Sequence, residues 1–267
     1  MISPTDEDAK FASEQLASGC DTMEHLLKGL LDSKGRVAEE VHAIRKLGKS
    51  LRGGFSLFRL EKNSAREIQA IGRLLSNPRD AVSRFNTWNK LAWQGDGSCV
   101  AAIHGLLEQQ THSAARRPPP ETISWCIERV TAARNHLQAL PPESLPERME
   151  IGIRKLGKQV IKRCRDLDQH GEDDFHDARK ALHAYLGALG FLPVGAIIPA
   201  PAMTELTEIL GDENDLATLS IWLESHGFTK DFVPDLWKKL EDSRANLRHQ
   251  AIVDAALLVP TKGKRKK

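Results

Sequence analysis

The segment 41–59, VHAIRKLGKSLRGGFSLFR, most constrains how this chain can fold, because its pattern is that of a helix with two unlike faces. At roughly 100° per residue, the α-helical value, its cations and one histidine fall within an arc of about 120°. The residues in this arc are His42, Arg45, Lys46, Lys49 and Arg52. The apolar residues on the opposite side, a pattern typical of a face packed against a core, are Ile44, Leu47, Leu51 and Phe58. The segment therefore predicts a helix with one buried face and one cationic face.

The cationic face predicts an anionic partner. No acidic residue interrupts the segment 41–60. Like charges four residues apart destabilise a helix by a few tenths of a kcal/mol per pair, so their stacking here calls for a ligand that offsets the repulsion. The net charge of the whole chain is only +2 at pH 7, which argues against a uniformly basic nucleic-acid binder. A whole-chain sum hides local clusters, however, and leaves a basic face possible.

Helical periodicity continues along the rest of the chain and predicts an all-α protein. Alternating strand-like runs are absent and β-branched residues are sparse. A length of 267 residues suits two subdomains. The pattern predicts helices over 6–31, 41–59, 64–75, 78–93, 100–110, 121–140, 147–169, 175–191, 202–210, 214–225 and 230–258. We expect a first helical half at 1–140, with a linker near 116–120, a second half at 141–258 and a basic, disordered tail at 259–267.

Cysteine spacing and hydropathy indicate a cytoplasmic protein. The four cysteines are widely separated and form no C-x-x-C pair, so neither a zinc site nor a disulfide framework is expected. The first ten residues contain no apolar stretch of the kind found in signal peptides. The longest apolar run, near Phe191, is short and is interrupted by prolines, so we expect no membrane-spanning helix.

The basic segment recurs in the second half of the chain. FHDARKALHAYL at 175–186 places His176, Arg179, Lys180 and His183 where VHAIRKLGKSLR has His42, Arg45, Lys46 and Lys49, although Leu186 replaces Arg52. An aspartate follows each copy at a similar distance: Asp80 follows His42 by 38 residues, and Asp215 follows His176 by 39. Two elements that recur at one offset predict two structurally similar halves. We expect Asp80 and Asp215 to cap a helix or to pair with a basic helix rather than to bind ligand.

A third basic helix lies between the two copies. The hexapeptide IRKLGK occurs at 44–49 and again at 153–158. In the second occurrence the cations fall within an arc of about 80°; they are Arg154, Lys158, Lys162 and Arg165. Glycines are interspersed in these helices, at Gly48, Gly53, Gly54 and Gly157, where they indicate either close helix packing or close approach of a ligand to the backbone.

These motifs resemble the CHAD family, the conserved histidine α-helical domain. The two HxxRKxxK/H helices, their aspartates and the intervening basic helix carry the resemblance, which extends from about residue 18 to residue 258. It implies two four-helix bundles related by pseudo-twofold symmetry around a central basic surface or pore. It also implies non-enzymatic binding of inorganic polyphosphate, with polyphosphate granules as a location. We expect no catalytic residue, cofactor or metal site.

The resemblance implies that the three basic helices supply the ligand-binding residues. In the first copy these are His42, Arg45, Lys46, Lys49 and Arg52. In the second they are His176, Arg179, Lys180 and His183, with Arg154, Lys158, Lys162 and Arg165 from the intervening helix. The second copy departs from the pattern, because Asp215 has lost the preceding arginine that Asp80 keeps. The contribution of the second half to affinity is therefore open.

Three other functions remain open at this stage. Nucleic acid would be attracted by the same cations, although single-strand binders usually add stacking aromatics, which the basic faces lack. His176-Asp177 resembles the dipeptide of metal-dependent phosphohydrolases of the HD type, for which His170 and Asp215 are candidate further ligands. A purely structural or protein-binding bundle is the third possibility.

Overall fold

The computed structural model describes residues 4–32, 37–114, 117–167, 169 and 171–259. Within these residues the chain forms ten α-helices and one short 3₁₀ helix, and no strand is present. The all-α prediction is confirmed. The helices are α1 Asp6–Asp32, α2 Val37–Leu57, α3 Ser64–Leu74, α4 Ser76–Leu91, α5 Gly97–Ala114, α6 Pro120–Gln138, α7 Leu145–Arg165, α8 Glu172–Leu189, α9 Pro201–Ser225 and α10 Pro234–Leu258.

Most predicted helices are present, but two of them are one helix. The segments 202–210 and 214–225 are joined in α9, which runs without interruption through Gly211. A single helical glycine costs only about 1 kcal/mol relative to alanine. The buried leucines on both sides of it, Leu206, Leu210, Leu216 and Leu219, offset that cost by packing on one face. The last helix begins at Pro234 rather than at residue 230, because proline suits the first turn.

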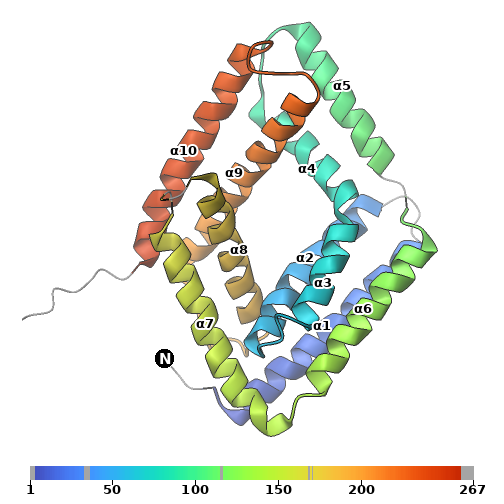
Figure 1. The fold of residues 1–267 in the computed structure, drawn as a ribbon, viewed down its shortest axis with the longest axis vertical. Coiled ribbons are helices and arrows are strands. Elements are labelled where there is room, and N and C mark those ends of the chain that lie inside the picture. Colours follow the sequence, from blue (N-terminus) through green and yellow to red (C-terminus); the bar gives the residue numbers. More distant parts are fainter. Residues whose placement is uncertain (1–3, 33–36, 115–116, 168, 170, 260–267) are drawn as a thin grey trace, which may run out of the picture. The chain divides into compact units, whose positions relative to one another are not determined.

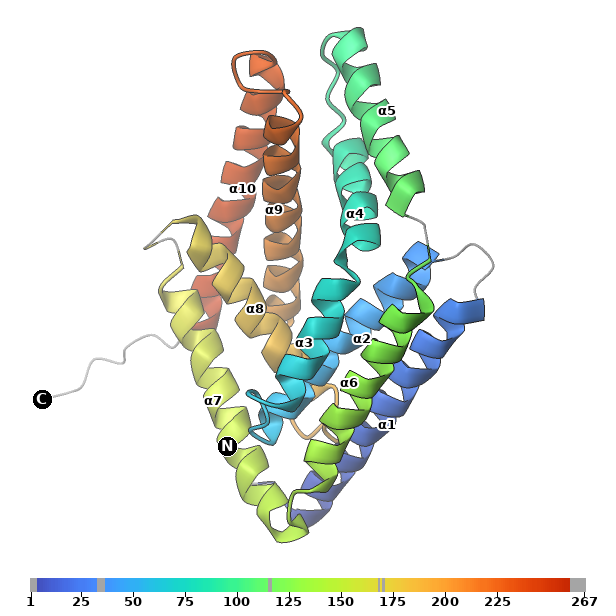
Figure 2. The ribbon, with the colours of Figure 1, turned by 45° about the vertical axis from the view of Figure 1, so that its right-hand side comes forward.

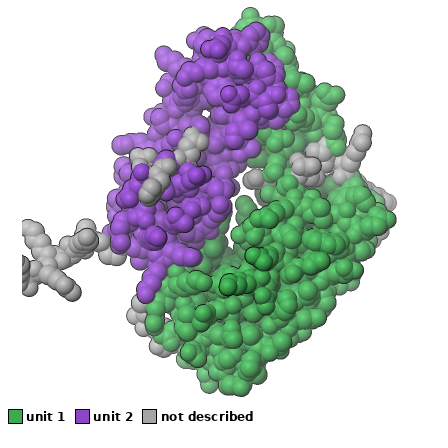
Figure 3. Space-filling view, in the orientation of Figure 1, with its two compact units in different colours: residues 1–156, 183–197 green, residues 157–182, 198–267 purple. Residues whose placement is uncertain are grey.

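The chain divides into two compact units, which Figure 3 distinguishes by colour. Unit 1 comprises residues 1–156 and 183–197, and unit 2 comprises 157–182 and 198–267. The division falls inside α7 and α8, so each of these helices starts in one unit and ends in the other. The predicted halves at 1–140 and 141–258 follow the sequence repeat and stay a prediction. The predicted tail lies, from residue 260 onward, outside the described residues.

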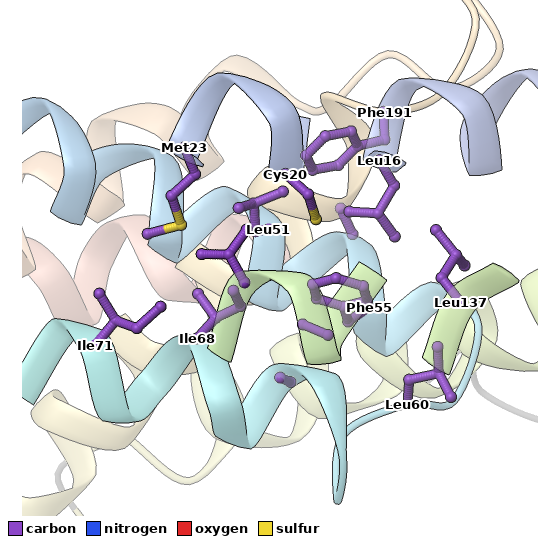
Figure 4. Close-up of a cluster of buried hydrophobic side chains, with 14 of the residues drawn as sticks. Leu16, Cys20, Met23, Leu51, Phe55, Leu60, Ile68, Ile71, Leu137 and Phe191 are labelled. Carbon is purple, nitrogen blue, oxygen red and sulfur yellow. The ribbon is translucent and has the colours of Figure 1, made fainter. Parts of the chain in front are cut away.

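Unit 1 has its core among four helices that pack in successive pairs: α1 on α2, α2 on α3, α3 on α6 and α6 on α1 (Figure 1). Fully buried side chains from these helices fill the interior, including Leu16, Met23, Leu51, Phe55 and Ile68 (Figure 4). Helices α4 and α5 pack on each other beside this core (Figure 2). The core fixes the orientation of α2 within the unit.

Unit 2 is built mainly on the pairing of α9 with α10 (Figure 1 and Figure 2). Glu213, which is buried in α9, accepts hydrogen bonds from Arg244 and Arg248 of α10 at 2.9 Å each. The Arg248 guanidinium also lies 5.2 Å from the centre of the Phe175 ring in α8. Unit 2 therefore uses its own buried charges to join three helices. Among the described residues of the whole chain, no helix is long and apolar enough to cross a membrane.

Candidate anion-binding site

The apolar side of α2 determines where its cations lie. Val41, Ile44, Leu51 and Phe55 have no solvent exposure and pack in the core of unit 1. His42 and Lys46 are exposed, and the other three cations of this face, Arg45, Lys49 and Arg52, are half-buried. Because these residues share one stripe of the helix, the predicted division of α2 into a buried face and a cationic face is confirmed.

The end of α8 lies against α2 at two glycines. A Cβ atom on Gly53 would lie 2.4 Å from the carbonyl oxygen of Ala184 and 2.6 Å from the amide nitrogen of Ala188. A Cβ atom on Gly187 would lie 2.9 Å from the Ser50 Cα. All three distances are shorter than a side chain tolerates, so Gly53 and Gly187 serve close helix packing. This packing brings the last turns of α8 beside the cationic face of α2.

The contact between these helices borders a pocket of about 380 Å³, which we call the α2–α8 pocket. Every residue that lines it belongs to unit 1. The lining consists of His42, Arg45, Lys46, Lys49, Ser50, His183, Leu186 and Gly187. Five of these, namely His42, Arg45, Lys46, Lys49 and His183, were predicted as binding residues. His183 lies far from the others in sequence, so the fold rather than the helix pattern places it there.

A second pocket, of about 270 Å³, lies on the α3 side of the same helix, and we call it the α2–α3 pocket. Arg45 and Lys49 line both pockets. Arg52 lines the second, together with Gln69, Arg73 and Ser76, which the sequence reasoning missed. The remaining lining residues are Met23, Ile44, Gly48, Ile68 and Gly72. Thus all five predicted residues of the first copy line one pocket or the other.

A signal for Arg73 was present in the sequence. Helices joined by a short turn pack antiparallel, so residues at similar distances from the turn meet. With α2 ending at Leu57 and α3 starting at Ser64, this rule brings Arg52 and Lys49 near the segment 69–73.

Arg45 is anchored by contacts with two other helices, α3 and α4. Its guanidinium lies 3.7 Å from an Asp80 carboxylate oxygen of α4, and it also donates a hydrogen bond to the Gly72 carbonyl. The prediction that Asp80 pairs with a basic helix is confirmed. Burial lowers the pKa of the Arg52 guanidinium, and the nearby positive charge of Arg73 lowers it further. Because arginine has a very high intrinsic pKa, the Arg52 side chain remains charged.

The second basic copy has its carboxylate on its own helix. Asp177 lies 3.3 Å from the Lys180 ammonium of α8 and 2.9 Å from the Arg163 guanidinium of α7. The Nδ1 atom of His176 lies 3.2 Å from the Asn214 side-chain oxygen of α9. Arg179 is half-buried in the same unit. None of His176, Arg179 and Lys180 lines either pocket.

The third basic column lies along α7. All four of its cations are exposed, and none lines either pocket: Arg154, Lys158, Lys162 and Arg165. Arg154 forms an ion pair with Glu150, one turn earlier on the same helix. The role of this column in binding stays a prediction.

A sequence model of the CHAD domain matches residues 14–224, which is most of the chain. The chain belongs to the CHAD family. A search of curated proteins found no match. Among solved structures, the crystal structure of the CHAD domain from the plant Ricinus communis is similar to this chain, with a TM-score of 0.64. The alignment covers 94% of this chain and 90% of that chain at 17% sequence identity, a likeness that shows the fold.

The metal-ligand arrangement considered from the sequence concerns unit 2 of this CHAD domain. His170 lies outside the described residues. Within the described part of the chain, no three or more His, Cys, Asp and Glu side chains gather in a way that could hold a metal ion. His176 and Asp177 instead make the contacts with Asn214, Lys180 and Arg163 given above.

Proposed function

We propose that this CHAD domain binds inorganic polyphosphate, without catalysis, through the cationic face of α2 and the α2–α8 pocket. The observation that carries the proposal is the convergence of residues from two distant segments. His42, Arg45, Lys46 and Lys49 of α2 line one pocket with His183 of α8. Among the residues that the structure describes, no acidic side chain lines it.

The residue types suit a flexible phosphate polymer. Arginine offers a planar fork of donors for phosphate oxygens, and lysine offers a mobile point charge. A cationic stripe that repeats along a helix matches anions that repeat along a chain. Histidine can add a proton near neutral pH, and an adjacent polyanion favours the charged imidazole. Much of the binding free energy would come from counterion release, as it does for nucleic acids, so affinity should fall steeply with added salt.

The proposal extends to the other features that the family resemblance implies. These are two four-helix bundles with pseudo-twofold symmetry, a central basic surface or pore, and a place in the cytoplasm on polyphosphate granules. The remaining predicted residues would add cations to the same ligand: Arg154, Lys158, Lys162, Arg165, His176, Arg179 and Lys180. Arg52 would act from the α2–α3 pocket.

The proposal is tested by titration with long-chain polyphosphate at two salt concentrations, in competition with double-stranded DNA and with heparin. We expect polyphosphate to bind more tightly than DNA of equal charge, and both to weaken as salt rises. Equal affinity for the two polymers would instead indicate general polyanion binding. Lys49→Glu should weaken binding, whereas Lys62→Glu, at an exposed turn position outside both pockets, should retain it.

The same samples test the proposed absence of catalysis. Purified protein is incubated with polyphosphate, with and without added Mn²⁺ or Mg²⁺, and released orthophosphate is measured. We expect release at the rate of the protein-free control. Release that requires metal and is lost in His176→Ala would favour the phosphohydrolase alternative.

A further inference from the structure

The α2–α3 pocket differs in character from the α2–α8 pocket, although the two share Arg45 and Lys49. Its interior is apolar: Met23, Ile44 and Ile68 are buried side chains of the core of unit 1. A Cβ atom on Gly48, at the base of the pocket, would lie 3.3 Å from Met23 Cε and 3.4 Å from Ile68 Cγ2. The pocket is therefore closed at its inner end by tightly packed core side chains, two of which, Met23 and Ile68, Figure 4 labels.

Four cations also line this pocket. Arg45, Lys49, Arg52 and Arg73 line it, and no acidic side chain does so within the described part of the chain. Asp80 offsets part of the Arg45 charge from outside the lining. Arg52 is half-buried beside the like charge of Arg73, and both conditions disfavour its charged form. An anion in the pocket would relieve this repulsion and supply acceptors for the guanidinium donors.

We infer that the α2–α3 pocket binds the terminal phosphoryl group of a linear polyphosphate, while the next phosphates of the chain follow Arg45 and Lys49 into the α2–α8 pocket. This inference rests on the proposed function and specifies that the protein recognises the end of the polyphosphate chain. Its structural basis is a pocket lined by both buried apolar side chains and four cations, next to a cationic stripe that the rest of the polymer can follow.

The closed floor favours a chain end over a chain interior. Phosphate oxygens that continued past the cations would meet Met23, Ile44 and Ile68, which donate no hydrogen bond. Burial of a charged oxygen without a partner costs several kcal/mol, so an extended chain cannot pass through the pocket. A chain that ends in it has no such cost.

The charge of a chain end also matches the pocket. By analogy with a phosphate monoester, a terminal phosphoryl group carries about −1.5 to −2 at pH 7 and three acceptor oxygens, whereas an internal phosphate carries about one charge. The guanidiniums of Arg52 and Arg73 and the ammonium of Lys49 can share those oxygens. Gln69 and Ser76, which also line the pocket, provide further neutral donors.

Linear tripolyphosphate and cyclic trimetaphosphate each contain three phosphates, but only the linear compound has chain ends. Each is used to displace a labelled polyphosphate of medium length, and the ratio of their inhibition constants is measured. The linear compound also carries more charge, so the ratio in the wild-type protein does not decide the matter alone. The decisive quantity is the change in that ratio between variants.

Arg73→Gln removes one pocket cation, and Arg66→Gln is its matched control on the same helix. Arg66 is exposed and lies outside both pockets. We expect Arg73→Gln to reduce the linear-to-cyclic preference about tenfold, the size of one lost charged contact. Arg66→Gln should leave the preference within about twofold of the wild type. An unchanged preference in Arg73→Gln would overturn the inference.

A second variant fills the pocket without changing its charge. Gly72 lines the pocket, and a Cβ atom built on it would meet nothing within 4 Å, so Gly72→Leu adds volume without a clash at the backbone. We expect it to lose the linear preference as Arg73→Gln does, while circular dichroism shows unchanged helicity. Retention of the preference in Gly72→Leu would likewise contradict end binding.

Long-chain polyphosphate distinguishes the two levels of the proposal. If wild-type protein fails to bind long chains, the proposed function itself is wrong. If long chains bind but both variants keep the wild-type preference, only the terminal site is wrong. At equal concentrations of chain ends, we expect chains of medium and great length to compete equally well in the wild type. Competition that instead follows total phosphate would also overturn the inference.

Discussion

The first and second basic copies share a sequence motif, but the second carries within its own helix a carboxylate, Asp177, that the first copy lacks. In unit 1, Arg45 of α2 is paired with Asp80, which comes from a different helix. In unit 2, the partner of Lys180 is Asp177, three residues earlier on the same helix. Asp177 occupies the place in the motif that Ala43 holds in the first copy. One residue of the repeat thus decides whether the column contains its own counter-charge.

This difference teaches that a cationic motif is not the same as an available cationic surface. Asp177 contacts Arg163 as well as Lys180, and so offsets two positive charges of unit 2 at once. On α2, by contrast, Arg45 and Lys49 line two pockets, and none of the described residues that line them is acidic. We therefore expect the first copy to contribute more to polyanion affinity than the second.

The largest expected effect comes from charge reversal of one lysine in each of the two columns, the half-buried Lys49 and the exposed Lys180. Lys49→Glu places an anion between the two pockets and should weaken polyphosphate binding by about tenfold to a hundredfold, since each lost charged contact is worth roughly tenfold. Lys180→Glu removes a cation that Asp177 already offsets and should weaken binding no more than about threefold. Calorimetric titration measures both, with circular dichroism as the control for folding. A larger effect at Lys180 would reverse the comparison.

Ala43 and Asp177 occupy the same place in the two copies, and exchanging their residue types should weaken polyphosphate binding by the first copy and strengthen binding by the second. Ala43→Asp installs a carboxylate three residues before Lys46, as Asp177 precedes Lys180, and should weaken binding by about threefold to tenfold through local pairing. Ala43→Asn is the neutral control. Asp177→Ala removes the counter-charge from unit 2 and should strengthen binding by a similar factor. If Asp177→Ala leaves affinity unchanged, the second column is not part of the binding surface.

The role of α2 could be predicted from the sequence because its information is local. The apolar stripe predicted from helical geometry consisted of Ile44, Leu47, Leu51 and Phe58, opposite the cationic stripe. The structure buries Ile44, Leu51 and Phe58 and leaves Leu47 half-buried, and Phe58 lies one residue beyond the end of α2. The salt bridge from Asp80 was also foreseen as one of two alternatives, since an aspartate at a fixed offset from a basic helix has few other roles.

The remaining features of the site depend on tertiary structure. Arg73 joins the α2–α3 pocket because α2 and α3 form an antiparallel pair, and His183 joins the α2–α8 pocket because the segment 183–197 packs with unit 1. Neither fact is contained in the periodicity of one helix. Likewise, α9 continues through Gly211 because of the buried leucines on either side, a packing effect that outweighs local propensity.

A smaller effect is expected in the salt dependence of binding. By analogy with nucleic acids, each phosphate contact that is lost should reduce the slope of log affinity against log salt by about 1. Lys49→Gln should show nearly this full reduction, whereas Lys180→Gln should show a fraction of it, because its charge is already offset by Asp177. Titrations at four or more salt concentrations measure the slopes. Equal reductions in the two variants would mean that both copies contact the polymer.

The smallest expected effect is on the rates at which the buried cysteine thiols are labelled. These rates report on each unit separately, because Cys20 and Cys126 lie in unit 1 and Cys164 lies in unit 2. Burial raises the pKa of Cys20 from its ordinary value of 9.0 to about 12, and those of Cys126 and Cys164 to about 11. At pH 8 these thiols therefore stay protonated and should react with Ellman's reagent only when their unit opens, more slowly than the partly exposed Cys99. Because folding raises these three pKa values, the thiols contribute fully to the free energy of unfolding below about pH 9. That contribution should be lost as the pH rises from 9 through the folded-state values of about 11 and 12.

Polyphosphate converts this labelling into a comparison of the two units. A ligand stabilises the unit that binds it, because binding to the folded form lowers the population of the open form. If the first copy dominates, added polyphosphate should slow the labelling of Cys20 and Cys126, both in unit 1, by several-fold more than that of Cys164 in unit 2. Mass spectrometry of the labelled peptides separates the three rates. Equal protection of all three thiols would show that the ligand stabilises both units alike, and stronger protection of Cys164 would assign the dominant contacts to unit 2.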